Sequence, residues 1–276
     1  MATLSVSTNV FPPAELLDCL EFCAKLGMAA VEVGPRNRLD GDSRTLAGAL
    51  AAFDLFGVRP LSMHAWTQVE GLEEVCEFAP KLGTGLIVVH CRHEKITGDF
   101  ANQVAMLTHW DAWCRRRGIV LTVENSSKQP LEPFVELFEA IPGLRLTLDV
   151  KHAYKPETLG LTHKDYMAKL ADRLANFHIS GIDRARDELG DGCPPGNDAV
   201  DWTELADDLS GRQYGGLITM ELNFPAYLTP ERREELYSDL PPVSNELPTL
   251  GHRLMKHAVD YYREALAPCL QRGSAE

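Results

Sequence analysis

Four residues in the second half of the chain have the types and the spacing to hold one divalent metal ion. They are Glu124, Asp149, His178 and Glu221, each near the end of a β-rich run. Three unpaired carboxylates brought together away from bulk water repel one another strongly, so such a group needs a positive charge beside it. Mixed carboxylate and imidazole ligation suits Mn²⁺, Co²⁺, Zn²⁺ or Mg²⁺. We therefore expect one of these ions at this place.

The runs that end at these residues alternate polar and apolar side chains, whereas strands covered on both faces usually read as continuous apolar runs. A smaller polar residue stands two positions before each candidate ligand, in the order Thr122, Thr147, Asn176 and Thr219. Side chains two apart on a strand share a face. We expect these polar sets to face the inside of a barrel and the apolar sets to pack on helices.

Two earlier runs, Ser62–Trp66 and Val88–Arg92, show the same alternation. It directs His64, Trp66 and His90 inward, where they are candidate substrate contacts. We expect the two histidines to face the substrate from the side opposite the metal cage. Trp66 could stack on an apolar face of the substrate, and a packed core aromatic is the alternative.

Eight β-rich runs alternate with longer helical stretches along the whole chain. The expected strands are Leu4–Val10, Ala29–Gly34, Val58–Trp66, Gly85–Arg92, Ile119–Ser126, Leu144–Val150, Leu174–Gly181 and Gly215–Asn223. The expected helices are Pro13–Gly27, Ser43–Phe56, Gly71–Leu82, Asp99–Arg117, Pro130–Ile141, Thr162–Arg173, Asp201–Gly211 and Asn245–Leu266. Asp201 stands three residues before Glu204, the spacing of an acidic helix cap.

This alternation predicts a single-domain (β/α)8 TIM barrel over residues 1–276, because parallel neighbours need a helical crossover and eight such units take about 250 residues. The alternative, an open doubly wound sheet, needs a Gly-rich turn after the first strand, and Asn9–Pro13 is not one. A Pro-rich stretch around 226–248 reads as an insertion after the eighth strand, either a lid, an oligomer contact or a surface excursion.

The composition narrows the classes of partner. A formal net charge of −13 argues against a broad phosphate-binding face, so we expect no nucleic-acid partner. The chain has neither an 18-residue apolar run nor a signal-like start, which predicts a cytoplasmic protein without a membrane partner. Seven cysteines without a Cys-x-x-Cys pair do not suggest a disulfide framework. A homo-oligomer is left open.

Eight short motifs follow one another at the ends of the expected strands and in the loops after them. They are Val31–Gly34, Ser62–His64, Val89–His90, Val123–Asn125, Asp149–His152, His178–Arg184, Val200–Trp202 and Met220–Glu221. In order and spacing they resemble the xylose isomerase-like barrel superfamily, which includes sugar-phosphate isomerase/epimerase-like proteins and, more distantly, endonuclease IV. The resemblance covers nearly the whole chain.

Within that superfamily the chain is most similar in its motifs to ketose 3-epimerases, in which Glu, Asp, His and Glu from strands five to eight hold a metal. The resemblance implies the same four ligands as above. It also implies substrate contacts at His152, three residues after the Asp, and at Arg184, six after the His. In such an enzyme Glu124 and Glu221 lie on opposite sides of the metal and exchange a proton with a carbon next to a carbonyl.

We therefore expect a metal-dependent isomerase or epimerase for a small sugar or polyol-like substrate. No Gly-rich cradle follows the seventh or eighth strand, which favours an unphosphorylated substrate, although Arg92, Lys128 and Lys151 could hold an anion or be solvated loop charges. The same cage also resembles those of inosose and dehydroshikimate dehydratases and of hydroxypyruvate isomerase. A protein that keeps the cage only to bind a small molecule is a further alternative.

The alternative from a different class is an AP endonuclease. His64, His90 and His152 match three further ligand positions of the endonuclease IV trinuclear zinc site. That site also requires an Asp-x-His after the seventh strand, and the corresponding segment, Gly190–Cys193, has no histidine. With the acidic net charge, this departure places the endonuclease behind the isomerase.

Overall fold

The computed structural model describes residues 1–10, 16–34, 43–65, 72–91, 99–126, 130–154, 161–182, 195, 199–222 and 250–270, with the backbone alone at 43–45, 73–74 and 250–253. Eight parallel strands close into a barrel in chain order, with β8 paired to β1. They are β1 (Thr3–Ser7), β2 (Ala30–Val33), β3 (Arg59–His64), β4 (Leu86–His90), β5 (Val120–Glu124), β6 (Arg145–Asp149), β7 (Leu174–Ile179) and β8 (Leu217–Met220). The predicted TIM barrel is confirmed.

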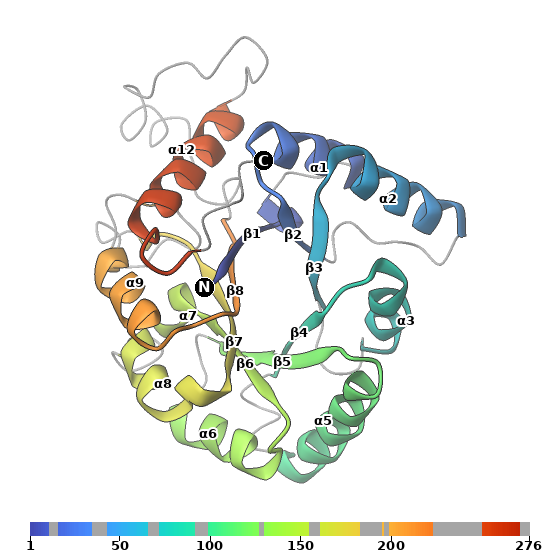
Figure 1. Cartoon of the computed structure of the whole chain (residues 1–276). Helices are drawn as coiled ribbons and strands as arrows, with labels where there is room; N and C mark the ends of the chain where they lie inside the picture. The colour runs from blue at the N-terminus through green and yellow to red at the C-terminus, as the bar shows by residue number, and fades with distance from the viewer. Residues whose placement is uncertain are drawn as a thin grey trace.

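The helices form an outer ring around the strands (Figure 1). The longer ones are α1 (Leu16–Lys25), α2 (Ser43–Phe56), α3 (Leu72–Leu82), α5 (Phe100–Arg115), α6 (Leu131–Ala140), α8 (His163–Leu170), α9 (Trp202–Gly211) and α12 (Leu250–Ala265). Short ones are η1 (Thr8–Val10), α7 (Val150–Ala153) and η4 (Ala171–Arg173). Among the described helices, none has the length and apolar character needed to cross a membrane.

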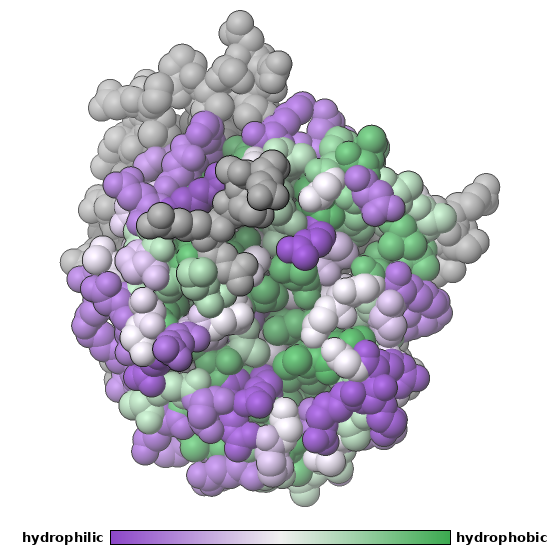
Figure 2. Space-filling view, in the orientation of Figure 1, coloured by the Kyte–Doolittle hydropathy of each residue, from purple (hydrophilic) through white to green (hydrophobic). Residues whose placement is uncertain are grey.

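Apolar and polar side chains lie where a closed barrel surrounded by helices needs them. Apolar side chains from the outer faces of the strands and the inner faces of the helices form one buried cluster. Figure 2 shows hydrophilic residues along much of the rim and hydrophobic ones gathered toward the middle of the face in view. The burial of both faces of each strand explains why the inward polar residues stand out in the sequence.

Inside the barrel, the predicted polar side chains bond to one another. Ser5 Oγ lies 2.7 Å from Thr219 Oγ1, which donates to Asn176 Oδ1 at 3.1 Å. On the other side, Thr147 Oγ1 donates to Thr122 Oγ1 at 2.7 Å. All five side chains are buried, so these bonds satisfy groups that water does not reach. They form a polar layer beneath the candidate ligands.

The strands end earlier than the sequence predicted, for local reasons. The run Leu144–Val150 stops at Asp149 because the Asp149 carboxylate accepts a hydrogen bond from the His152 backbone N–H at 3.0 Å and caps α7. Leu4–Val10 likewise stops at Ser7, where η1 begins. The insertion expected around 226–248 lies outside the described residues.

The predicted cap of α9 is confirmed. Asp201 Oδ1 accepts a hydrogen bond from the Glu204 backbone N–H at 2.9 Å. We predict that Asp201→Ala lowers the free energy of unfolding by about 1 kcal/mol, since an N–H at the helix start loses its partner. Urea unfolding followed by circular dichroism measures this. Asp207→Ala, at an exposed position of the same helix, is the control and should change the value by less than about 0.5 kcal/mol; an equal loss in both variants would contradict the capping role.

Candidate metal centre

The four expected ligands converge at the mouth of the barrel. Glu124, Asp149 and His178 end or nearly end β5, β6 and β7, and Glu221 follows β8 directly. One ligand atom of each lies within 4.8 Å of those of the other three. The first three side chains are buried, and Glu221 is 16% exposed. The strand ends therefore bring together residues that are up to 97 positions apart in the chain (221 − 124).

Backbone contacts fix the position of Asp149. Asn125 Oδ1 accepts a hydrogen bond from the Asp149 N–H at 2.7 Å, and Asn125 Nδ2 donates to the Asp149 carbonyl at 3.0 Å. Asp149 Oδ1 caps α7, which leaves Oδ2 directed at the cluster. Asn125 thus holds a candidate ligand in place, and in the sequence it stood out only as part of the Val123–Asn125 motif.

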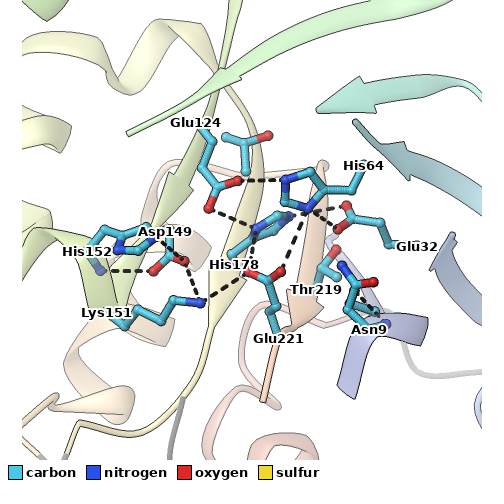
Figure 3. Close-up of polar contacts among 12 residues, drawn as sticks. Asn9, Glu32, His64, Glu124, Asp149, Lys151, His152, His178, Thr219 and Glu221 are labelled. Carbon is cyan, nitrogen blue, oxygen red and sulfur yellow. Dashed lines mark hydrogen bonds and ion pairs between the residues drawn. The ribbon is translucent and has the colours of Figure 1, made fainter. Parts of the chain in front are cut away.

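The donor atoms fit a metal ion. His178 Nδ1 lies 3.3 Å from Glu124 Oε1 and 3.2 Å from Glu221 Oε2, as Figure 3 shows. His178 Nδ1, both Glu124 oxygens and Asp149 Oδ2 are buried without an aligned hydrogen-bond partner. Two donors each about 2.1 Å from one ion are about 3.0–3.4 Å apart at octahedral or tetrahedral angles. These residues could therefore hold the divalent ion that the sequence implies.

Lys151 also reaches the cluster. Its Nζ lies 3.2 Å from Asp149 Oδ2 and 3.3 Å from Glu221 Oε2, with the side chain 11% exposed. The alternative that Lys151 is a solvated loop charge is therefore wrong. Its ammonium neutralises part of the negative charge at the outer side of the cage.

The two histidines of β3 and β4 lie against the cage. His64 Nε2 is 3.2 Å from Glu124 Oε2, and His64 Nδ1 is 3.7 Å from Glu221 Oε1. His90 Nε2 is 3.0 Å from His64 Nε2 and 3.4 Å from Glu124 Oε2. The expectation that these side chains lie opposite the cage is wrong, because β4 pairs directly with β5, with His90 in register with Glu124, and β3 pairs with β4. Substrate contact by either remains a prediction.

Glu32, on β2, is a buried residue of this cluster for which the sequence predicted no role. Its Oε2 accepts hydrogen bonds from Ser62 Oγ at 2.9 Å and Asn176 Nδ2 at 3.4 Å, and lies 3.2 Å from His178 Nε2. Its Oε1 lies 3.3 Å from His64 Nδ1. A glutamate in the apolar run of residues 29–33 was the available signal, because a buried carboxylate needs partners.

The packing of acids and imidazoles shifts several pKa values. Burial opposes ionisation of Glu32, but His178 and His64 lower the pKa of its carboxyl to about 2. Burial alone would lower the pKa of His64, whereas its contacts with Glu124 and Glu32 raise it to about 10. Burial raises the pKa of Asp149 to about 7. The charges of Glu124 and Glu221 add to this rise, and the ammonium of Lys151 opposes it. Asp149 is therefore a carboxyl whose ionisation a bound cation would favour strongly.

Of the remaining predicted substrate contacts, the structure describes only His152. His152 Nε2 lies 3.7 Å from Asp149 Oδ2, and its side chain is 16% exposed at the edge of the cluster. Trp66 and Arg184 lie outside the described residues. So do Arg92, Lys128 and the segment Gly190–Cys193.

Residues 20–240 match the family model described as xylose isomerase-like TIM barrel. The chain belongs to this family. The match spans most of the sequence and includes every strand from β2 to β8 together with the four candidate ligands. A comparison with curated proteins finds no match.

Solved structures share the fold at low sequence identity. A D-psicose 3-epimerase with D-tagatose from Clostridium cellulolyticum is 15% identical, with a TM-score of 0.71 over 96% of this chain and 99% of that one. The 3-keto-D-glucoside 4-epimerase from E. coli is 15% identical, with a TM-score of 0.64 over 97% and 98%. A probable 3-DHS dehydratase from Bacillus anthracis is 14% identical, with a TM-score of 0.61 over 80% and 92%.

We predict that chelation lowers the melting temperature and that Mn²⁺ restores it, because a ligand of the native state alone stabilises by about 2.7 kcal/mol at a hundredfold excess over its Kd. Differential scanning fluorimetry with EDTA and with added Mn²⁺ measures this. Asp149→Asn should lose the response and the exposed Asp207→Asn should keep it. Chelated protein that melts unchanged, from a preparation in which metal analysis finds none, would contradict the metal centre.

The metal-free protein should lose stability as the pH rises from 6.5 to roughly 8.5. The upper limit keeps the pH below the values at which buried cysteine thiols would ionise. The pKa of His64 is raised from 6.5 to about 10, so its stabilising charge is complete below 6.5 and lost as the pH approaches 10. Linkage gives a loss of up to about 1.4 kcal/mol per pH unit for one such group. Urea midpoints at each pH measure the slope.

His64→Gln should lower this slope, because one group that takes up a proton on folding is gone. Burial opposes it, but Glu32, Glu124 and Glu221 raise the pKa of His178 as well, so part of the slope remains. His163→Gln is the matched control. His163 is also buried, but burial lowers its pKa, so it takes up no proton on folding and is neutral in both states over the upper part of this range. A slope that is unchanged in His64→Gln would assign the pH dependence to other groups.

Proposed function

We propose that this protein is a divalent-metal-dependent sugar isomerase or epimerase that acts on a ketose or a related polyol-derived substrate by proton abstraction next to a carbonyl. The observation that carries the proposal is the placement of two glutamates around one ligand. Glu124 Oε1 and Glu221 Oε2 lie 3.3 Å and 3.2 Å from the same His178 nitrogen and come from different strand ends. Two bases that reach one centre from different strands suit a reaction that removes and returns a proton.

Each residue of the centre has a role in this proposal. Glu124, Asp149, His178 and Glu221 hold the ion, which when bound would polarise the carbonyl and acidify the neighbouring C–H bond. One of the two glutamates takes the proton, and the other delivers one to the opposite face of the resulting enediolate. The low exposure of this group excludes water, which would otherwise quench the carbanion-like intermediate.

Substrate orientation falls to side chains at the rim. His152 and His90 are the more exposed imidazoles of the cluster, at 16% and 29%, and can donate to hydroxyl oxygens. His64, Trp66 and Arg184 complete the set expected from the sequence. The epimerases among the solved structures of the same fold support an epimerase-type reaction, and the probable dehydratase keeps an inosose- or dehydroshikimate-type dehydratase as the runner-up.

An endonuclease IV-like activity is a second candidate, favoured by one of the two further groups of possible metal donors among the described residues. His64, His90 and Glu124 place their ligand atoms together, with Glu124 common to this group and the four-ligand group, so a second ion could bind there. The net charge of −13 disfavours the phosphate backbone of DNA as a partner. The isomerase or epimerase is therefore the function that the site supports better.

We predict that the Mn²⁺-loaded protein exchanges a carbon-bound hydrogen of a ketose with D₂O, and that Glu124→Gln and Glu221→Gln each lower the rate at least about 100-fold, as expected for loss of a general base. Proton NMR of D-fructose, D-psicose and D-tagatose, followed by inososes and keto acids, measures exchange and product. Metal is kept saturating so that weaker binding does not mimic loss of the base. Glu139→Gln, at an exposed position of α6, is the control and should keep the full rate.

The products decide among the alternatives. Loss of water from an inosose or a dehydroshikimate would replace the epimerase by the dehydratase. Two or three zinc ions per chain with cleavage of abasic DNA would replace it by the endonuclease. Tight metal binding with no exchange on any of these probes would leave a binding protein.

A further inference from the structure

Glu32 is a buried acid beside the metal centre that the proposed reaction does not use. Its side chain is fully buried beneath the metal centre, and neither oxygen belongs to the four-ligand group. A lone buried carboxylate is costly, so its partners indicate why it is there. Those partners come from two other strands: Ser62 and His64 on β3, and Asn176 and His178 on β7. Figure 3 shows Glu32 beside His64 and His178.

The hydrogen bonds around Glu32 all run toward its carboxylate, which accepts each of them. Thr219 Oγ1 donates to Asn176 Oδ1 at 3.1 Å, so the Asn176 amide turns its NH₂ group toward Glu32 Oε2. Ser62 Oγ donates to the same oxygen at 2.9 Å. An ionised carboxylate only accepts hydrogen bonds, so the His178 Nε2 at 3.2 Å must carry a proton and donate it.

The proton on Nε2 determines what the other nitrogen of His178 can do. A neutral imidazole with Nε2–H has a lone pair on Nδ1. Nδ1 faces Glu124 Oε1 and Glu221 Oε2 without an aligned hydrogen bond. Three lone-pair donors that converge in this way suit a shared cation, and the opposite tautomer would place a proton where the ion belongs.

We propose that Glu32 is a positioning residue for the metal centre, which fixes the tautomer and the ring orientation of His178 so that Nδ1 is presented to the ion. The inference rests on the metal centre of the proposed function, but on neither its substrate nor its reaction. Glu32 acts through His178 and does not touch the substrate.

The test compares Co²⁺ binding by the wild type and by Glu32→Gln. The amide keeps the shape but can direct an NH₂ group at His178 Nε2, which favours a proton on Nδ1. Loss of such a carboxylate partner typically weakens metal binding 10–100-fold, and we expect a loss of that size. Competition with a chromophoric chelator gives the Kd, and the visible absorption of bound Co²⁺ reports the ligand geometry, which should change in the variant.

Ser62→Ala is the matched control, since it removes one donor to Glu32 and leaves the carboxylate in place. It should bind Co²⁺ with no more than a few-fold loss and an unchanged spectrum. Equal affinity and spectrum in Glu32→Gln and the wild type would overturn the role of Glu32, as would an equal loss in Ser62→Ala. A wild type that binds no Co²⁺ would instead overturn the metal centre itself.

A measurement on the wild type covers the case in which Glu32→Gln does not fold. Long-range ¹⁵N–¹H correlation spectra of protein labelled at histidine, loaded with Zn²⁺, distinguish the two tautomers. The His178 signals are identified by their loss in His178→Gln. We expect the proton on Nε2 and the metal on Nδ1; the reverse assignment would overturn the proposal.

Discussion

The concentration of negative charge at the mouth of the barrel is the constraint on which the rest of the site depends. Glu32, Glu124 and Asp149 are buried, and Glu221 is nearly so. Carboxylates in such surroundings repel one another and lose their hydration, so they stay ionised only beside positive charge or strong donors. The imidazoles and Lys151 supply part of this positive charge, and the divalent ion that we propose would supply the rest. The pKa of Asp149, raised to about 7, indicates that the protein groups alone do not meet it fully.

The barrel holds these charges together by a polar layer one step deeper. The hydroxyl and amide groups of Ser5, Thr122, Thr147, Asn176 and Thr219 bond to one another across neighbouring strands. A layer of this kind contains no net charge and leaves few buried groups unsatisfied, so it supports the charged layer above it without adding to its repulsion. The Asn125 clamp on the Asp149 backbone serves the same end by restricting the movement of a strand end.

His178 lies at the centre of the arrangement. One of its nitrogens faces Glu124 and Glu221, and the other faces Glu32. An imidazole can meet a carboxylate on one side and an ion on the other only if its proton is fixed on one nitrogen. The inner carboxylate and the outer pair are thus linked through one ring, which couples the deep part of the barrel to the part that would meet the substrate.

The sequence by itself determined the architecture and pointed to the four residues that meet at the mouth of the barrel. The alternation of strands and helices specified an eight-unit barrel, and the inward parity of Thr122, Thr147, Asn176 and Thr219 marked which face each candidate ligand shares. This worked because side-chain direction on a strand repeats every two residues and is a local property. The start of a helix at Asp201 could be predicted for the same reason, because a cap depends on residues that are close in the sequence.

Only the tertiary structure decided how near these residues come and which others join them. The period of a strand gives the face of a side chain but not its height or its distance from strands elsewhere in the chain. That is why His64 and His90 were expected on the far side and lie against Glu124 instead. Glu32 and Lys151 were readable as charges, but their partners are up to 146 and 70 positions away, and barrel closure alone brings them into contact.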